Sequence, residues 1–264
     1  MNFHLPFIPN RNPKPRTSGI TMVMDKGLSV RETEDFISSS GEYVDFVKFG
    51  FGTSLITKNL EEKIKLYNDA NIRPYFGGTL FEMFIVRGMY DEFRRFVDRY
   101  RLDLIEISDG SISLPHEEKL KYISELSKQA TVISEVGSKV AGVVISHEKW
   151  VEMMKLELEA GSFKVIAEAR ESGNIGIYNP DGTANKELIN DIIEHVDTNN
   201  IIWEAPNKPQ QVWFIKLLGC NVNLGNIAPN EVIALETLRL GLRGDTFFQF
   251  LPEEITHQYI MKHA

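Results

Sequence analysis

Residues 43–67 read YVDFVKFGFGTSLITKNLEEKIKLY, and this stretch contains the unit that decides the fold. It opens with a run of β-branched and aromatic residues at 43–49, which is typical of a buried strand. After a glycine-rich turn, Leu60, Ile64 and Tyr67 recur at the spacing of one face of an amphipathic helix. The stretch therefore predicts a strand that is followed by a helix.

The same unit recurs along the chain. Its strand-like runs lie at 20–24, 43–49, 72–76, 102–107, 131–136, 163–168, 201–204 and 221–224. Helical patterns separate these runs, and such an alternation implies parallel strands joined by crossover helices. The chain has 264 residues, close to the roughly 250 residues of a typical (β/α) barrel. We therefore predict an α/β fold, a (β/α)8 TIM barrel in a single domain.

An open, doubly wound sheet is the alternative arrangement of eight such units. No G-x-G-x-x-G follows the first strand-like run, which removes the main argument for a dinucleotide-binding sheet and favours the barrel. Ahead of the first run, residues 1–18 are rich in proline, arginine and lysine. We expect these residues to form an irregular N-terminal arm.

Composition narrows the classes of partner. The net charge is −8, and an acidic surface repels both nucleic acid and anionic lipid. A single cysteine, Cys220, excludes an internal disulfide. The N-terminus lacks the pattern of a signal peptide, and no run approaches the roughly 18 apolar residues that span a bilayer. We expect a cytoplasmic protein that binds neither nucleic acid nor membrane.

Polar side chains gather where the predicted strands end, which is where barrels of this kind build their active sites. They are Asp25, Lys26, Lys48, Glu106, Ser108, Glu135, Lys139, Glu168, Arg170, Glu204, Asn207, Lys208, Asn223 and Asn226. Charged groups on buried strands are costly unless they are paired or bound to a metal. A ring of salt bridges without a substrate is one explanation. Several carboxylates beside several cations also suit a metal ion and an anionic substrate.

The residue types favour a hard metal ion. Glutamate and aspartate offer the oxygen ligands that Mg²⁺ prefers. The six histidines are scattered, and none ends a predicted strand, which argues against a zinc site.

Eight short motifs lie along the chain, namely GITMVMDKG at 19–27, DFVKFGFGTS at 45–54, GGTLFE at 77–82, IEISDG at 105–110, EVGSK at 135–139, EARESG at 168–173, EAPNK at 204–208 and LETLRLGLRGDTF at 235–247. Together these motifs resemble the phosphosulfolactate synthase family. The resemblance covers 19–247, in order and at about the right spacing. At 138, Ser138 stands where archaeal members typically have the first of two lysines, whereas Lys139 keeps the second.

The resemblance implies a barrel that adds sulfite to phosphoenolpyruvate with the help of Mg²⁺, giving (2R)-O-phospho-3-sulfolactate. In methanogenic archaea this reaction begins one route to coenzyme M, bacterial relatives are linked to sulfolactate, and plant relatives are heat-stress-associated proteins. It also implies a catalytic domain at 19–247 and a C-terminal extension at 248–264. We expect this extension to pack on the surface or on a neighbouring subunit of a homo-oligomer.

Roles follow from the chemistry that the resemblance implies. An enediolate-like intermediate needs a metal for its charge and an acid for protonation. We assign Lys139 as that acid, and Lys48 and Arg170 as the groups that orient phosphate or sulfite. The expected metal ligands are Glu106, Glu135, Glu168, Asp25 and Glu204. The expected substrate-binding residues are Lys26, Ser108, Asn207, Lys208, Asn223 and Arg243. Arg239 suits either a phosphate site or a solvated helix face.

Two alternative functions stay open at this point. Lys48 or Lys139 would serve as the nucleophile of a Schiff-base aldolase. Alternatively, the barrel is a stress-associated protein without catalytic activity, as the plant relatives allow. Retention of nearly the whole charged ring speaks against a scaffold, because a scaffold gains nothing from buried charge.

Overall fold

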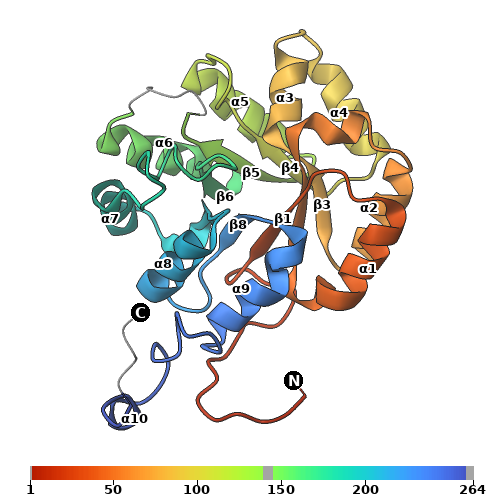
Figure 1. Cartoon of the computed structure of the whole chain (residues 1–264). Helices are drawn as coiled ribbons and strands as arrows, with labels where there is room; N and C mark the ends of the chain where they lie inside the picture. Colours follow the sequence, from red (N-terminus) through yellow and green to blue (C-terminus); the bar gives the residue numbers. More distant parts are fainter. Residues whose placement is uncertain (1, 139–144, 260–264) are drawn as a thin grey trace.

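The computed structural model describes residues 2–138 and 145–259, and eight parallel strands form its centre. The strands are β1 (Thr21–Asp25), β2 (Phe46–Phe49), β3 (Arg73–Phe76), β4 (Leu104–Ile107), β5 (Thr131–Val136), β6 (Ser162–Ala167), β7 (Ile201–Glu204) and β8 (Leu224–Ile227). Their order is β3-β2-β1-β8-β7-β6-β5-β4, and β3 packs beside β4 where the ring closes. The structure confirms the predicted single-domain (β/α)8 barrel (Figure 1).

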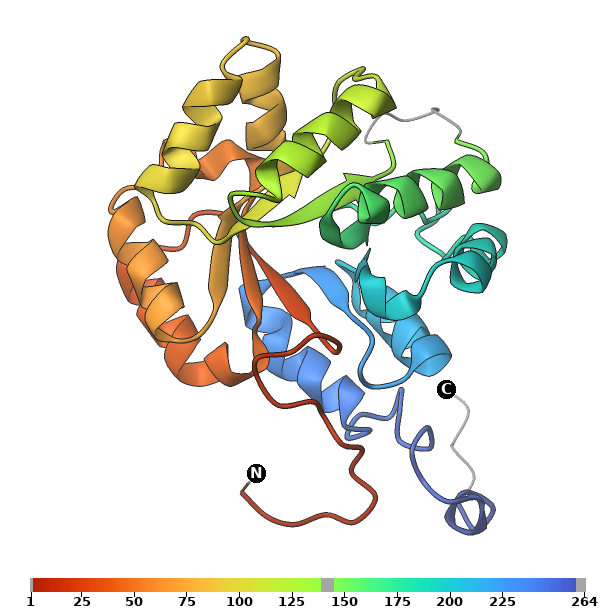
Figure 2. The ribbon, with the colours of Figure 1, turned by 180° about the vertical axis from the view of Figure 1, so that it is seen from behind.

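Helices surround the strands, as the two opposite views show (Figures 1 and 2). They are α1 (Val30–Ser40), α2 (Leu60–Asp69), α3 (Gly78–Ile85), α4 (Tyr90–Arg99), α5 (His116–Leu126), α6 (His147–Glu159), α7 (Lys186–His195), α8 (Lys208–Leu218), α9 (Val232–Arg239) and α10 (Glu253–Thr256). Short 3-10 turns lie at Gly41–Tyr43, Gly50–Leu55, Thr198–Asn200 and Pro229–Glu231. Within the described ranges, no helix is both long enough and apolar enough to cross a membrane.

Alternation along the strands separates the inside of the barrel from the layer under the helices. A plug of eight buried side chains fills the inside, namely Ile20, Met22, Phe46, Tyr75, Leu104, Ile133, Ile166 and Ile202. Because side chains alternate between faces, the residue two positions further along each strand also faces inward. This rule places Lys48 above Phe46 and Glu106 above Leu104, at the carboxyl ends of the strands.

The eighth strand lies three residues later than expected. We predicted 221–224, whereas β8 runs from Leu224 to Ile227. Val222 and Leu224 favour a strand by residue type, but Gly225 and Asn226 are poor strand formers. Pairing of β8 with β1 and β7 overrides this local preference.

The N-terminal arm packs against the end of the barrel opposite the carboxyl ends of the strands, beside β1, β2 and β8. The Arg11 guanidinium lies 2.9 Å from the Glu236 carboxylate and donates to the Cys220 carbonyl at 3.0 Å. Arg16 pairs with Asp45 at 3.1 Å, and Asp45 accepts the backbone N–H of Thr21 at 2.9 Å. Residues 2–19 contain no helix or strand, as expected of an irregular arm.

Arg239 lies at the same end of the barrel and is neither a phosphate ligand nor a solvated side chain. It is fully buried and donates to the carbonyls of Cys220 at 2.7 Å and Val222 at 2.6 Å. Burial lowers the pKa of the Arg239 guanidinium to about 9. Its role is to satisfy backbone groups just before β8.

The chain after α9 packs on the outside of the barrel. Phe250 contacts the turn at Gly241, and the Gln249 amide donates to the Lys216 carbonyl of α8 at 3.4 Å. The short helix α10 lies further out (Figure 1). The division of the chain into an arm, a catalytic domain and an extension beginning at 248 stays a prediction.

Candidate active site

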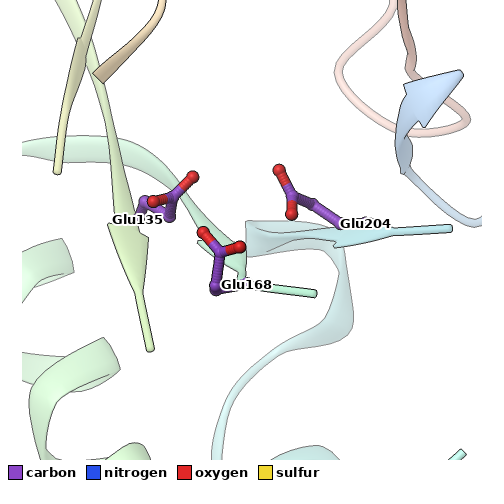
Figure 3. A group of neighbouring side chains, drawn as sticks. All are labelled: Glu135, Glu168 and Glu204. Carbon is purple, nitrogen blue, oxygen red and sulfur yellow. The ribbon is translucent and has the colours of Figure 1, made fainter. Parts of the chain in front are cut away.

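Three glutamates from neighbouring strands meet at the mouth of the barrel. Glu135 and Glu204 stand at the ends of β5 and β7, and Glu168 directly follows β6. One carboxylate oxygen of each lies within 4.8 Å of the others, and each side chain is 1% exposed. Figure 3 shows the three carboxylates directed into a shared space. Such closely grouped negative charges, buried from water, favour a cation between them.

Lys48 reaches this cluster from the other side of the barrel. Its ammonium nitrogen lies 3.0 Å from Glu106, 3.6 Å from Glu135 and 3.6 Å from Glu204. Burial opposes the charge on Lys48, but Glu106 and then Glu135, Glu204 and Glu168 hold the pKa of the ammonium well above its ordinary value. The Lys48 ammonium therefore stays charged among these carboxylates.

Glu106 faces inward as expected but lies apart from the group of three. Its Oε1 accepts the backbone N–H of Gly78 at 2.5 Å, and its Oε2 faces Lys48. Gly78 begins α3, and a Cβ there would meet the Ser108 Cβ at 2.3 Å, so the approach requires glycine. Glu106 therefore anchors Lys48 and α3 beside the metal-binding candidates.

Ser108 and Glu82 form a buried layer behind Glu135. The Ser108 hydroxyl lies 2.6 Å from the Glu82 carboxylate and 2.8 Å from the Glu135 carboxylate, and its single proton is donated to one of them at a time. Glu82 also accepts the backbone N–H of Ser111 at 3.0 Å. Sequence reasoning missed Glu82, although an acid within the apolar run of α3 is a usable signal.

Tyr75 is a second residue that sequence reasoning missed. It lies in the plug inside the barrel and pairs in register with Lys48 across β2 and β3. Burial, followed by the charge of Glu106, raises the pKa of the Tyr75 phenol well above its ordinary value. The signal in the sequence is an aromatic hydroxyl one position before the end of β3.

A cavity of about 440 Å³ opens above the carboxylates, a size typical of small-molecule sites. It is lined by Met24, Lys48, Phe51, Thr79, Ser111, Glu135, Glu168, Arg170, Glu171, Ser172, Glu204 and Asn226. A larger hollow of about 1130 Å³ lies between α8 and the segment before α7. The lining described for that hollow includes none of the strand-end glutamates, so we place the active site in the smaller cavity.

Arg170 and Lys26 bring positive charge to this mouth. Arg170 adopts a left-handed backbone with φ of 54°, and its N–H donates to Glu168 at 2.6 Å. Its side chain is exposed and lines the cavity. Lys26 forms an ion pair with Glu171, itself a lining residue, and both are about half exposed, so the pair contributes little to stability.

Asp25 does not join the carboxylate cluster, contrary to the sequence-based expectation. Met24 lines the cavity, so the next residue of β1 faces the helices instead. There the Asp25 carboxylate lies 2.7 Å from the Lys63 ammonium and accepts the Tyr67 hydroxyl at 2.9 Å. Its other oxygen accepts the N–H of Gly27 at 2.9 Å. The arrangement fixes the loop that carries Lys26.

Asn223 was expected to bind substrate but lies at the opposite end of the barrel. Its side chain accepts the Ile20 N–H at 3.0 Å and donates to the Ile201 carbonyl at 2.9 Å, so it lies beside the starts of β1 and β7. The displacement follows from the three-residue error in the position of β8.

The other expected substrate-binding residues also lie outside the described lining of the cavity, namely Lys26, Ser108, Asn207, Lys208 and Arg243. Asn207 caps α8 and donates to the Ser172 carbonyl at 3.3 Å. Lys208 pairs with Asp245 at 2.7 Å, and Arg243 lies 3.9 Å from the same carboxylate. The expected acid, Lys139, falls outside the described residues.

Comparison with known proteins shows which family the chain resembles. Residues 9–245 match the family described as (2R)-phospho-3-sulfolactate synthase (ComA). A phosphosulfolactate synthase of Bacillus subtilis is 46% identical over 244 residues, covering 91% of this chain and 97% of the relative. One from Methanothermobacter thermautotrophicus is 41% identical over 244 residues, covering 90% of this chain and 95% of the relative.

Solved structures share the fold at low sequence identity. The 3-hexulose-6-phosphate synthase of Salmonella typhimurium has a TM-score of 0.52 and 13% identity, with 85% of this chain and 100% of that chain covered. This likeness supports the barrel fold alone. The sequence matches, in contrast, extend over most of both chains at more than 40% identity and include the strands that carry Glu135, Glu168 and Glu204. The chain therefore belongs to the (2R)-phospho-3-sulfolactate synthase family.

Proposed function

We propose that this protein adds sulfite to phosphoenolpyruvate and forms (2R)-O-phospho-3-sulfolactate. The observation that carries the proposal is the convergence of Glu135, Glu168 and Glu204 with Lys48 beneath a 440 Å³ cavity. Family membership supports the same reaction, because the bacterial and archaeal relatives bear its name.

The three glutamates are the proposed ligands of a Mg²⁺ ion. Their grouped oxygen atoms form a hard donor set of the kind that Mg²⁺ prefers, and sulfur or imidazole ligands are absent from the group. A bound Mg²⁺ supplies a Lewis acid that favours negative charge on a substrate carboxylate. Glu106, which was also expected to bind metal, instead orients Lys48 in this scheme.

The proposed reaction forms a carbon–sulfur bond at the methylene carbon of phosphoenolpyruvate. The sulfur lone pair of sulfite attacks this carbon, and the electron pair of the double bond moves onto the substrate carboxylate. A proton then bonds to the phosphate-bearing carbon as that electron pair returns. Among the described lining residues, Lys48 and Arg170 are the cations available for orienting the substrate anions. The assignment of Lys139 as the acid stays a prediction.

The contacts of Lys48 disfavour a Schiff-base mechanism at this residue. An imine forms from a neutral amine, whereas the Lys48 nitrogen faces three carboxylates within 3.6 Å and is buried among them. Borohydride treatment in the presence of a carbonyl substrate should leave no adduct on Lys48. A trapped adduct at this position would favour the aldolase over sulfite addition.

The direct test mixes the purified protein with phosphoenolpyruvate, sulfite and Mg²⁺ and measures phosphosulfolactate by mass spectrometry. Omission of sulfite and exhaustive chelation are the controls, and each should abolish the product. No product from the complete mixture would reject the proposal and favour a non-catalytic barrel. The cytoplasmic location and the homo-oligomer also stay predictions.

A further inference from the structure

A bulge in β8 turns one side chain into the active-site cavity. Thr21 of β1 pairs with Leu224, but Val23 pairs with Ile227, so Met22 alone faces both Gly225 and Asn226. Leu224 and Ile227 both belong to the cluster under the helices, which strict alternation would forbid. Asn226 accommodates the bulge because its backbone is left-handed, with φ of 56°. Bulges of this kind re-aim a side chain and occur beside active sites.

The side chain of Asn226 is buried, and its oxygen atom is unsatisfied within the described residues. It is 8% exposed and lines the 440 Å³ cavity together with Lys48 and Glu204. Its Oδ1 atom accepts no hydrogen bond from any residue in 2–138 or 145–259. As placed, the unsatisfied atom is an acceptor, so an anion in the cavity would be bound through the Nδ2 donors of the same amide.

The chemistry of an amide suits an anionic ligand in an acidic cavity. A neutral carboxamide offers two N–H donors without adding charge, and half a turn of the amide exchanges its oxygen and nitrogen. The Asn226 amide lines the same cavity as Lys48 and Arg170, so it adds hydrogen-bond donors for an anion that these cations attract. The end of β8 is also the part of a barrel that frequently binds phosphate.

We infer that the Asn226 carboxamide binds a phosphate oxygen of phosphoenolpyruvate. The inference rests on the proposed function, because that function supplies the phosphorylated substrate. Asn226 is then a substrate-binding residue that the bulge in β8 holds in place. Asparagine meets both demands of the position, since it tolerates the left-handed backbone and carries the donor.

Two variants separate binding from backbone geometry. Asn226→Gly keeps the left-handed backbone without strain but removes the amide. Asn226→Asp keeps the shape and places a negative oxygen where the donor was. We expect the KM for phosphoenolpyruvate to rise roughly tenfold in Asn226→Gly, equivalent to about 1.4 kcal/mol, and further in Asn226→Asp. The KM for sulfite and the Tm should stay near the wild-type values. Asn230→Gly, at an exposed position after β8, is the matched control.

Binding measurements keep this test independent of turnover. Calorimetric titration with phosphoenolpyruvate, and separately with inorganic phosphate, should show weaker binding to both Asn226 variants than to wild type and Asn230→Gly. If wild type forms no product, the proposed function fails, while these titrations still decide the role of Asn226. Wild-type affinity in Asn226→Gly, an effect confined to sulfite, or no binding of either ligand to wild type would overturn the inference.

Discussion

At the scale of single residues, the direction of a side chain decides which acids can act together. The side chains of Glu135, Glu168 and Glu204 all point into the barrel, and one carboxylate oxygen of each lies within 4.8 Å of the others. Asp25 is equally close to a strand end, but its side chain points out toward the helices and pairs with Lys63 instead. Two acids that look equivalent in the sequence therefore have different tasks.

The first prediction concerns Glu168. Glu168→Gln removes a charged oxygen from the group of three, so the affinity for Mg²⁺ should fall by more than the roughly 10–100-fold that loss of an outer partner of a metal ligand causes. Calorimetric titration with Mg²⁺ measures the change. Glu148→Gln, at an exposed position in the first turn of α6, should bind Mg²⁺ like wild type. Unchanged affinity in Glu168→Gln would remove this residue from the proposed ligands.

The second prediction concerns Asp25. Asp25→Asn leaves the fully buried Lys63 ammonium without its carboxylate, which should lower the free energy of unfolding by roughly 3–5 kcal/mol. Urea denaturation measures this loss. The Mg²⁺ affinity of the folded variant should stay near that of wild type. A loss of Mg²⁺ affinity with unchanged stability would instead restore Asp25 as a metal ligand.

Much of the carboxylate cluster is predictable from the sequence, because its members stand at the ends of recognisable strands. Lys48, Glu135, Glu168 and Glu204 were all singled out in this way, and the structure brings them together. The local sequence does not show which residues of a strand point into the barrel, and this direction excludes Asp25 from the cluster. It also does not show the contacts between strands. Glu82 reaches the cluster through such a contact, by way of the Ser108 hydroxyl.

At the scale of elements, β8 shows how pairing overrides local preference. Its residue types point to a strand at 221–224, yet the flanking strands hold 224–227 in the sheet. The other seven strands were each located within about three residues because their β-branched runs coincide with the paired segments. The bulge at Asn226 has no local signature beyond the glycine beside it, so its effect on the site could not be predicted.

The third prediction concerns the start of β6, where Lys164 is buried. Its ammonium donates to the Asn199 carbonyl at 2.6 Å, and burial lowers its pKa from 10.5 to about 8, although Asp197 opposes the shift. The unfolded chain holds this proton up to about pH 10.5, whereas the folded protein releases it near pH 8. The unfolded state therefore binds more protons between these values, and this group should make stability rise with pH there.

A comparison of variants isolates this contribution. The difference in free energy of unfolding between wild type and Lys164→Met, measured by urea denaturation from pH 7 to 10, should increase with pH in favour of wild type. Lys155→Met, at an exposed position of α6, should show a constant difference. A constant difference in Lys164→Met as well would show that Lys164 titrates normally.

At the scale of the whole molecule, metal binding and folding should be coupled. The fold holds Glu135, Glu168 and Glu204 together, whereas the unfolded chain does not. At free Mg²⁺ of about one hundred times Kd, the folded state should gain about 2.7 kcal/mol, which corresponds to a rise in Tm of roughly 5–10 °C. Differential scanning calorimetry with and without chelator measures this shift. Glu168→Gln should respond far less, and an equal response in both proteins would contradict a site at these glutamates.

The plug of side chains inside the barrel fills the space directly below the proposed active site. Ile20, Met22, Phe46 and their neighbours fill the barrel below the glutamates. In the described chain, ligands therefore enter and leave through the cavity at the carboxyl ends of the strands. The ligand that binds deepest in the cavity must therefore bind first and dissociate last. A metal at the glutamates would be trapped under phosphoenolpyruvate, and a chelator should extract it more slowly once that substrate is seated.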